Sequence, residues 1–310
     1  MSFKILISDK IESICPEIFS KAGFTVDEKS GLTPAELQAA IGDYHGLVVR
    51  SATTVTEKVL ASGAAGNLKI VGRAGAGLDN IDLKAAEAHG IKVVNTPGLN
   101  ANAVAELVIA YLVILARKLG PAMSSIKAGR WEKKGLAGTE ISGKTIGLVG
   151  LGAVGRLVAK KAIGLGLSVI AYDPFLTKAD IEAAGVSEAA LDQIWAQADF
   201  ISLHLPKTPE TVNLIGAEVL SKVKKSAFII NCARGGLVDE EALSVALTEG
   251  RLAGAAADVF VSEPPDGSPL LALDNFVATP HLGASTLEAQ LGVAEKVAEL
   301  MVDFLTGVVK

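Results

Sequence analysis

The stretch TIGLVGLGAVG, Thr145–Gly155, joins a run of aliphatic residues to a turn with glycines at Gly150, Gly152 and Gly155. The pattern G-x-G-x-x-G is weak by itself. Here the helical run RLVAKKAIGLG follows it, and a second aliphatic segment ends in Asp173, 18 residues after the last glycine. In that context the pattern predicts a dinucleotide-binding turn between a β-strand and an α-helix. The alternative is a glycine turn of the same fold without a ligand.

Each residue type in this turn has a physical reason. Gly150 permits a tight turn, Gly152 lets the backbone approach a pyrophosphate, and Gly155 lets helix and strand pack closely. The helix N-terminus, at Ala153 and Val154, would offer free backbone N–H groups to the phosphates. Asp173 can accept hydrogen bonds from both ribose hydroxyls but would repel a 2′-phosphate, so the predicted cofactor is NAD rather than NADP.

Short aliphatic runs alternate with helical patterns on both sides of the turn. The predicted strands are residues 4–8, 46–50, 69–73, 92–95, 145–149, 168–172, 200–203, 227–231, 254–258 and 276–278. A long helix at about 103–118 and a segment without core periodicity, KAGRWEKKGLAGTEISGK, divide them into two series, and a last helix is expected at about 286–305. This alternation predicts an α/β protein with two doubly wound parallel-sheet domains.

Composition supports this fold class and argues against several function classes. Half of the 310 residues are hydrophobic, 32 are glycine, and the net charge is −5 without a long basic run, so nucleic acid is not an expected partner. The first ten residues lack the apolar core of a signal peptide, and the longest apolar stretch, 107–116, is too short to span a bilayer. Cys15 and Cys232 form neither a disulfide framework nor a metal site, so we expect a cytoplasmic protein without a bound metal.

Three polar residues follow the later predicted strands: Arg234 in NCARGG, Glu263 in ADVFVSEPP and His281 in TPHLGAST. Oxidation of an alcohol by NAD needs a base, which suits His281, and a fixed cation for a carboxylate or oxyanion, which suits Arg234. Glu263 would hydrogen-bond the imidazole and select its tautomer. The alternatives are a capping histidine, a salt-bridged surface arginine and an ordinary loop glutamate, but their shared position at strand ends favours hydride transfer.

The combination GLGAVG, NCARGGLVDE, ADVFVSEPP and TPHLGAST resembles the D-2-hydroxyacid dehydrogenase family along nearly the whole chain. The resemblance implies that Arg234, Glu263 and His281 are catalytic. It further implies four positions around the nicotinamide: Cys232, Ala233, Asp258 and Gly283. It also implies the domain order, with a Rossmann NAD-binding domain at 97–284 inserted into a flavodoxin-like substrate domain of residues 1–96 and 285–310. A dimerisation arm is expected around 118–142, in a homodimer.

The substrate is indicated by arginines in the first strand series. Arg50 and Arg73 end predicted strands, and two converging arginines would suit a phosphate dianion, while the turn at Ala74 and Gly75 could present N–H groups to a carboxylate. The resemblance further implies that Lys133, in the WEKK segment of the arm, reaches the phosphate site of a neighbouring subunit. The alternative for Arg50 and Arg73 is a pair of surface salt bridges, and the alternative for the WEKK segment is a solvated run of charges.

The arginines favour a small phosphorylated 2-hydroxy acid as substrate. Together with them, the resemblance implies NAD-dependent oxidation of 3-phospho-D-glycerate to 3-phosphohydroxypyruvate, a step of serine biosynthesis. One alternative is a hydroxypyruvate or glyoxylate reductase on the same scaffold, and another is a corepressor that binds NAD without catalysis. Longer members of the family carry a C-terminal regulatory domain, whereas this sequence ends at Lys310 after its last predicted helix, so we expect little inhibition by serine.

Overall fold

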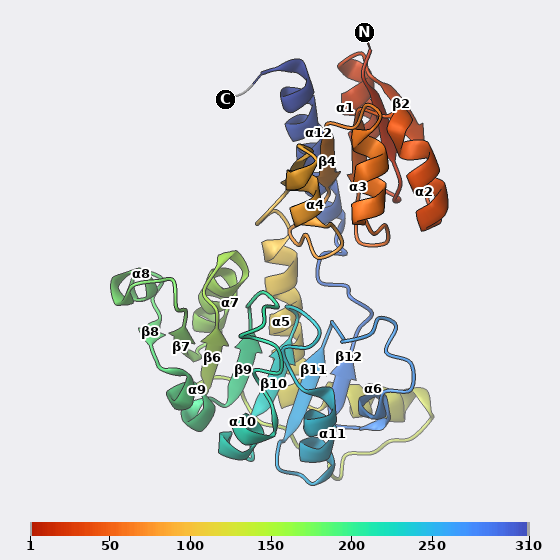
Figure 1. Ribbon diagram of the computed structural model, residues 1–310. Coiled ribbons are helices and arrows are strands. Elements are labelled where there is room, and N and C mark those ends of the chain that lie inside the picture. The colour runs from red at the N-terminus through yellow and green to blue at the C-terminus, as the bar shows by residue number, and fades with distance from the viewer. Residues whose placement is uncertain (1, 309–310) are drawn as a thin grey trace. The chain divides into compact units, whose positions relative to one another are not determined.

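A computed structural model describes residues 2–308 of the chain. The chain forms two compact units (Figure 1). The flanking unit contains the residues up to Asn100 together with those from Ala284 onward, and the central unit is Ala101–Gly283. Each unit is built on its own parallel sheet with helices on both faces.

The sheet of the flanking unit has five strands in the order β2-β1-β3-β4-β5. Their bounds are β1 Lys4–Ile7, β2 Thr25–Glu28, β3 Gly46–Val49, β4 Ile70–Arg73 and β5 Lys92–Asn95. Every residue of β3 is buried, as a strand covered on both faces requires. The strand order reverses between β1 and β3, so ligands of this unit are expected beyond the carboxyl ends of those strands.

Two groups of helices cover this sheet. One face carries α1 (Ile14–Lys21) and the C-terminal helix α12 (Leu287–Thr306), and the other carries α2 (Pro34–Ala40), the short helix η1 (Ile41–Asp43), α3 (Glu57–Ala64) and α4 (Leu83–Ala88). Thr33 and Glu36 form the capping box that starts α2. A Cβ on Gly72 would lie 2.3 Å from Met301 Sδ, so a glycine in the sheet allows α12 to pack closely.

The sheet of the central unit has seven strands in the order β12-β11-β10-β9-β6-β7-β8. Their bounds are β6 Thr145–Val149, β7 Ser168–Tyr172, β8 Ser187–Glu188, β9 Phe200–Leu203, β10 Phe228–Asn231, β11 Gly254–Ala257 and β12 Phe276–Ala278. The order reverses between β6 and β9, which places a ligand crevice beyond the carboxyl ends of these two strands.

Helices α5 (Ala101–Ala116), α7 (Ala153–Gly164) and α8 (Lys178–Glu182) pack on one face of this sheet. Helices α9 (Leu191–Gln197), α10 (Ala217–Lys222) and α11 (Glu240–Thr248) pack on the other. Helix α6 (Leu119–Lys127) follows α5, and a short helix η2 (Pro269–Ala272) precedes β12. Residues 128–144, which lacked core periodicity, form neither helix nor strand.

The predicted fold class, two parallel α/β domains, is confirmed. Two strands were missed. β2 has the sequence TVDE with no fully buried residue, and β8 is two exposed residues long, so neither carries the apolar run that identifies a strand. Among residues 2–308 no helix combines the length and the apolar character needed to cross a membrane.

Candidate active site

The glycine turn after β6 has a backbone that other residues could not adopt. Gly150 has a φ of 100°, and a Cβ there would lie 2.5 Å from the His204 carbonyl oxygen. A Cβ on Gly155 would lie 2.4 Å from the Gly150 carbonyl oxygen. Gly152, the N-cap of α7, differs: within the described chain, a Cβ there meets no atom closer than 4 Å beyond its immediate neighbours. The turn therefore leaves an open space at the N-terminus of α7, next to Ala153 and Val154.

Asp173 stabilises this turn from the end of the neighbouring strand β7. Its Oδ2 accepts a hydrogen bond of 2.8 Å from the Leu151 N–H, and its Oδ1 accepts one of 3.0 Å from the Phe175 N–H. A carboxylate oxygen accepts two hydrogen bonds, so each oxygen retains capacity for a hydroxyl donor of a ligand. The residue expected to bind ribose is thus also part of the turn.

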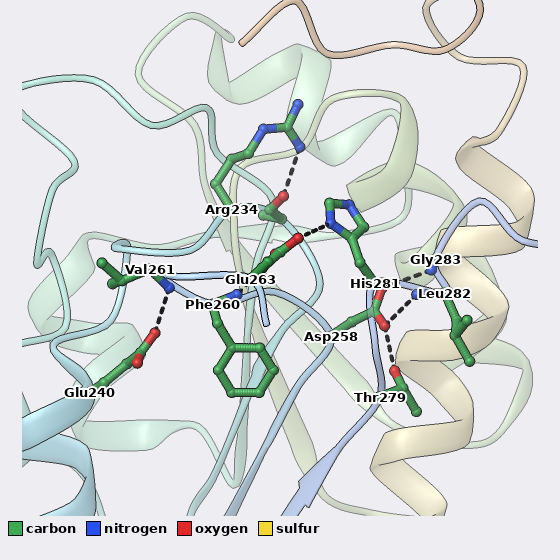
Figure 2. Close-up of polar contacts among 11 residues, drawn as sticks. Arg234, Glu240, Asp258, Phe260, Val261, Glu263, Thr279, His281, Leu282 and Gly283 are labelled. Atoms are coloured by element: carbon green, nitrogen blue, oxygen red, sulfur yellow. Dashed lines mark hydrogen bonds and ion pairs between the residues drawn. The ribbon is translucent and has the colours of Figure 1, made fainter. Parts of the chain in front are cut away.

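His281 and Glu263 lie together although they belong to loops after different strands. Nδ1 of His281 is 2.7 Å from Glu263 Oε2, while Glu263 Oε1 accepts a hydrogen bond of 3.1 Å from the Phe260 N–H (Figure 2). The side chains are 51% and 39% exposed, so the pair is accessible to a ligand. With Nδ1 engaged by a carboxylate, Nε2 is the nitrogen that can exchange a proton.

The backbone of His281 is held by Asp258, the residue that directly follows β11. His281 has a φ of 54°, an uncommon value for a residue with a side chain, and its N–H donates to the Asp258 carbonyl at 2.9 Å. The buried Asp258 carboxylate accepts 2.7 Å hydrogen bonds from the N–H groups of Leu282 and Gly283, one on each oxygen (Figure 2). The predicted contact of Asp258 with a nicotinamide amide stays a prediction, and the structure adds a role in holding the histidine loop.

Arg234 follows β10, and the side chain of Asn231 shapes its loop. The Asn231 amide donates to the Arg234 carbonyl at 2.9 Å and accepts from the Ala233 N–H at 3.1 Å. Arg234 Nη1 donates to the Ala233 carbonyl at 2.7 Å. In Figure 2 the Arg234 and His281 side chains rise from separate loops toward the same side. Asn231 was missed as a site residue, although a buried polar residue at the end of an aliphatic strand is a usable signal.

Gly235 joins the arginine loop to the glutamate loop. A Cβ on Gly235 would lie 1.8 Å from the Phe260 carbonyl oxygen, so the two backbones touch at a position where only glycine fits. The neighbouring Cys232 is buried, and burial raises the pKa of its thiol well above the usual value. Burial thus disfavours the thiolate form that a nucleophilic cysteine needs.

In the flanking unit, Arg50 directly follows β3 and Arg73 is the last residue of the adjacent strand β4. Arg73 is paired with Val49, the residue before Arg50. A Cβ on Gly75, whose φ is 145°, would lie 1.5 Å from Arg73 Nη1, so the guanidinium folds over the turn that also contains Ala74. The Arg50 guanidinium donates a 3.3 Å hydrogen bond to the Lys10 carbonyl, beyond β1.

Two further residues, both missed by sequence reasoning, hold the Arg50 loop. The buried carboxylate of Asp9 accepts hydrogen bonds from the N–H groups of Arg50 and Thr53 and, at 2.7 Å, from the Thr53 hydroxyl. The Asn80 amide donates to the carbonyls of Arg50 and Thr53 at 2.8 and 2.6 Å. These contacts join segments far apart in the sequence, so no local pattern could reveal them.

The family follows from comparison with known proteins. A family model described as "D-isomer specific 2-hydroxyacid dehydrogenase, NAD binding domain" matches residues 109–283. The chain belongs to the D-isomer specific 2-hydroxyacid dehydrogenase family. The predicted resemblance to this family is confirmed, and the central unit carries the family's NAD-binding domain.

Similar proteins extend this assignment over nearly the whole chain. A D-3-phosphoglycerate dehydrogenase of Synechocystis sp. is 47% identical over 304 residues, which cover 98% of this chain and 54% of that protein. The chain thus spans about half the length of the curated relatives it matches. A crystal structure of a Thermus thermophilus protein has a TM-score of 0.89 at 34% identity and covers 98% of this chain and 97% of its own. The structure of an NAD⁺-bound 3-phosphoglycerate dehydrogenase of Entamoeba histolytica has a TM-score of 0.83 at 32% identity. The match covers 100% of this chain and 97% of that one.

The residues of this dehydrogenase domain fit the predicted cofactor, NAD. His204 directly follows β9 and lies beside the glycine turn, and its Nε2 is buried without a hydrogen-bond partner among residues 2–308. Burial lowers the pKa of His204 to about 4, so the ring is neutral at physiological pH. A polar ligand bound on this turn could hydrogen-bond the buried His204 nitrogen and occupy the open space at Gly152.

The expected arm, residues 118–142, covers helix α6 and the irregular segment that follows it. The Lys133 ammonium lies over the ring of Trp131, 5.9 Å from its centroid, and Trp131 is 80% exposed. A role for Lys133 in a phosphate site of a neighbouring subunit stays a prediction.

Proposed function

We propose that this chain catalyses NAD-dependent oxidation of 3-phospho-D-glycerate to 3-phosphohydroxypyruvate. The observation that carries the proposal is the half-exposed His281–Glu263 pair, 2.7 Å apart, in loops next to that of Arg234. The 47% identical relative named D-3-phosphoglycerate dehydrogenase supports the choice of substrate. Arg50 and Arg73, at the carboxyl ends of adjacent strands in the flanking unit, also support it.

His281 acts as the base in this proposal. Its Nε2 accepts the proton of the C2 hydroxyl while the hydride leaves C2, and in the reverse direction the imidazolium returns that proton. Glu263 stabilises the imidazolium because its carboxylate is hydrogen-bonded to Nδ1 at 2.7 Å. When bound, NAD supplies the acceptor for the hydride.

Arginines orient the substrate. The Arg234 guanidinium matches the planar carboxylate and also stabilises charge that develops on the C2 oxygen. We assign the phosphate to Arg50 and Arg73, and the N–H groups of Ala74 and Gly75 are the further candidates for the carboxylate. Arg50 suits this role because Asp9 and Asn80 fix its backbone through hydrogen bonds to its N–H and carbonyl.

The cofactor is bound by the glycine turn. The backbone at Gly152, Ala153 and Val154 would cradle the pyrophosphate at the N-terminus of α7, a helix of 12 residues. Asp173 would accept the ribose hydroxyls and, because a 2′-phosphate would meet its negative charge, favour NAD over NADP.

We further propose a homodimer formed through the arm. Leu119, Met123 and Ile126 are 36%, 58% and 55% exposed and lie on one face of α6, close in sequence to the exposed Trp131. Exposed apolar side chains at helical spacing are typical of a protein interface. Ile126→Glu should shift the sedimentation coefficient toward that of a monomer, while Leu271→Glu, at a position 52% exposed on η2, should not.

The decisive experiment follows NADH absorbance with 3-phosphohydroxypyruvate beside hydroxypyruvate, glyoxylate and pyruvate. Preference for the phosphorylated substrate by about 100-fold or more in kcat/KM, the scale of two charge-assisted contacts, is expected. Preference for a small 2-oxo acid would retain the catalytic roles and overturn the substrate. Tight NADH binding without turnover of any of the four would overturn the enzymatic proposal.

A further inference from the structure

Helix α5 carries one phenol among apolar residues. Tyr111 is 1% exposed and lies between the buried Val108 and Leu112 in the segment ANAVAELVIAYLVILA. Burial raises the pKa of Tyr111 above its usual value, so the hydroxyl keeps its proton at physiological pH. Phenylalanine would fill the same space without a polar atom, and a buried hydroxyl is costly unless it is hydrogen-bonded. The hydrogen bonds of the Tyr111 hydroxyl should therefore show why a tyrosine occupies this position.

The Tyr111 hydroxyl leads to the histidine loop. It lies 3.3 Å from the Ala257 carbonyl oxygen and within a short hydrogen bond of the Thr279 hydroxyl. The Thr279 hydroxyl in turn donates a short hydrogen bond to Asp258 Oδ1 (Figure 2). A carboxylate only accepts, so the Thr279 proton points to Asp258. The Thr279 oxygen remains to accept from Tyr111, whose single proton is shared with the more distant Ala257 carbonyl. The result is a polarised chain from phenol to hydroxyl to carboxylate.

The end of this chain is the carboxylate that orders His281. Asp258 accepts from Thr279 and from the N–H groups of Leu282 and Gly283, on both sides of a residue whose φ of 54° is unfavourable by itself. The N–H of His281 also donates to the Thr279 carbonyl at 3.0 Å. Thr279 therefore contacts the histidine loop with its backbone and with its side chain.

Helix α5 contacts this loop at a second position, two turns earlier. A Cβ on Gly283 would lie 3.3 Å from Val104 Cγ2 and 3.1 Å from Asp258 Oδ2. Val104 and Tyr111 are seven residues apart on one face of a 16-residue helix. The helix thus forms a rigid support for the segment from Thr279 to Gly283.

We propose that Tyr111 and Thr279 are positioning residues for His281, acting through Asp258. Neither contacts the imidazole. They hold the Asp258 carboxylate, which fixes the backbone of the loop and so the direction of Nε2. The activity readout rests on the proposed function, whereas the spectroscopic readout below does not.

The first test compares near-isosteric variants of Thr279. Thr279→Val removes the hydroxyl with little change of shape, and Thr279→Ser retains it. We expect Thr279→Val to lower kcat about tenfold or more, the scale of a lost hydrogen bond to a charged group, with the KM for NADH changed by less than about twofold. Thr279→Ser should retain kcat to within about threefold. Equal effects of Val and Ser would overturn the proposal.

Tyr111→Phe tests the outer end of the chain, with Tyr44→Phe as its matched control. The buried Tyr44 hydroxyl donates to Asp27 at 2.7 Å in the flanking unit, so this control removes the same kind of hydrogen bond elsewhere. Tyr111→Phe should lower kcat about three- to tenfold, and Tyr44→Phe should not change it. Tyr111→Phe with the kcat of the unchanged protein would contradict a positioning role.

Imidazole NMR of the unliganded protein gives the second readout. The chain has four histidines. In the spectrum of ¹⁵N-histidine-labelled protein, the signals that disappear in His281→Asn are assigned to His281. The His281 shifts should match in the parent protein and Thr279→Ser, and should move or broaden in Thr279→Val and Tyr111→Phe. Unaltered His281 signals in both latter variants would overturn the proposal. If the protein turns over no hydroxy acid, the proposed function fails, but this NMR experiment still tests whether Tyr111 and Thr279 position His281.

Discussion

Oε2 of Glu263 lies 2.7 Å from Nδ1 of His281, although the two residues are 18 positions apart and follow different strands. The second oxygen of Glu263 is held by the Phe260 N–H at 3.1 Å, so the glutamate is oriented by its own loop. A carboxylate fixed in this way selects the tautomer with a proton on Nδ1 and leaves Nε2 as the base.

Replacing His281 by Asn should therefore remove the base without removing the binding groups. We expect kcat to fall about 10³-fold, within the range of general acid–base catalysis, while KM changes far less. Glu263→Gln retains a hydrogen-bonding group but loses the charge, and its kcat should fall about 10²-fold. Steady-state kinetics of both variants beside the parent protein checks these points, and an unchanged kcat in His281→Asn would remove the assignment.

Gly152→Ala separates cofactor binding from folding. A Cβ there meets nothing within 4 Å of the described unliganded chain, so the thermal midpoint should stay the same or rise slightly. The added methyl group occupies the proposed pyrophosphate space, and Kd for NADH should increase about tenfold or more. Calorimetric titration and thermal unfolding measure the two effects. An unchanged Kd would place the pyrophosphate elsewhere.

Gly235→Ala should damage the catalytic site through the backbone. Its Cβ would lie 1.8 Å from the Phe260 carbonyl oxygen, so the loops of Arg234 and Glu263 must separate. We expect kcat/KM to fall about 100-fold, the scale reported for a displacement of about 1 Å at a catalytic group. Gly164→Ala, at the end of α7, is the matched control because its Cβ meets nothing within 4 Å in the described chain and should leave kcat/KM unchanged. Equal activity of the two variants would disprove the close contact.

His204 should make the folded state sensitive to mild acid. Its pKa is lowered to about 4 by burial, so between the ordinary histidine value and pH 4 the unfolded chain binds a proton that the folded chain does not. The free energy of unfolding should fall as pH decreases through this window and level off below it. The His204 contribution to this fall is at most about 3.5 kcal/mol. His204→Gln should reduce the slope of the unfolding free energy from pH 7 to 5.

In His204→Gln the unfolding free energy should still depend on pH between 7 and 5, because the pKa of His45 is also lowered. The larger cause of that shift is burial, and the smaller is the charge of nearby Lys69. Denaturant unfolding at several pH values gives the comparison. Identical slopes for the two proteins would mean that the His204 ring is charged or accessible in the folded state.

Arg50→Ala tests the phosphate assignment. Loss of one guanidinium from a phosphate should raise KM for 3-phosphohydroxypyruvate about 10²-fold, with little change for hydroxypyruvate, which lacks the phosphate. Arg251→Ala, which removes an exposed arginine paired with Glu249, is the control. A similar rise of KM for both substrates would indicate a role of Arg50 in the loop rather than in phosphate binding.

The sequence by itself determined the fold class, because strands, helices and the glycine turn are local patterns. The bounds of β5, β6 and β7 agree with the prediction residue for residue, since each is an aliphatic run closed by a turn. The order of Arg234, Glu263 and His281 after successive strands was equally visible, because parallel topology brings the carboxyl ends of strands to one edge.

Only the tertiary structure decided how these residues are held. The backbone contact at Gly235, the hydrogen bonds of Asp258 to Leu282 and Gly283, and the support of the Arg50 loop by Asp9 and Asn80 join segments distant in the chain. The weak edge strand β2 likewise depends on pairing with β1 rather than on its own composition. Such contacts arise from packing between elements, and no periodicity or motif within one segment encodes them.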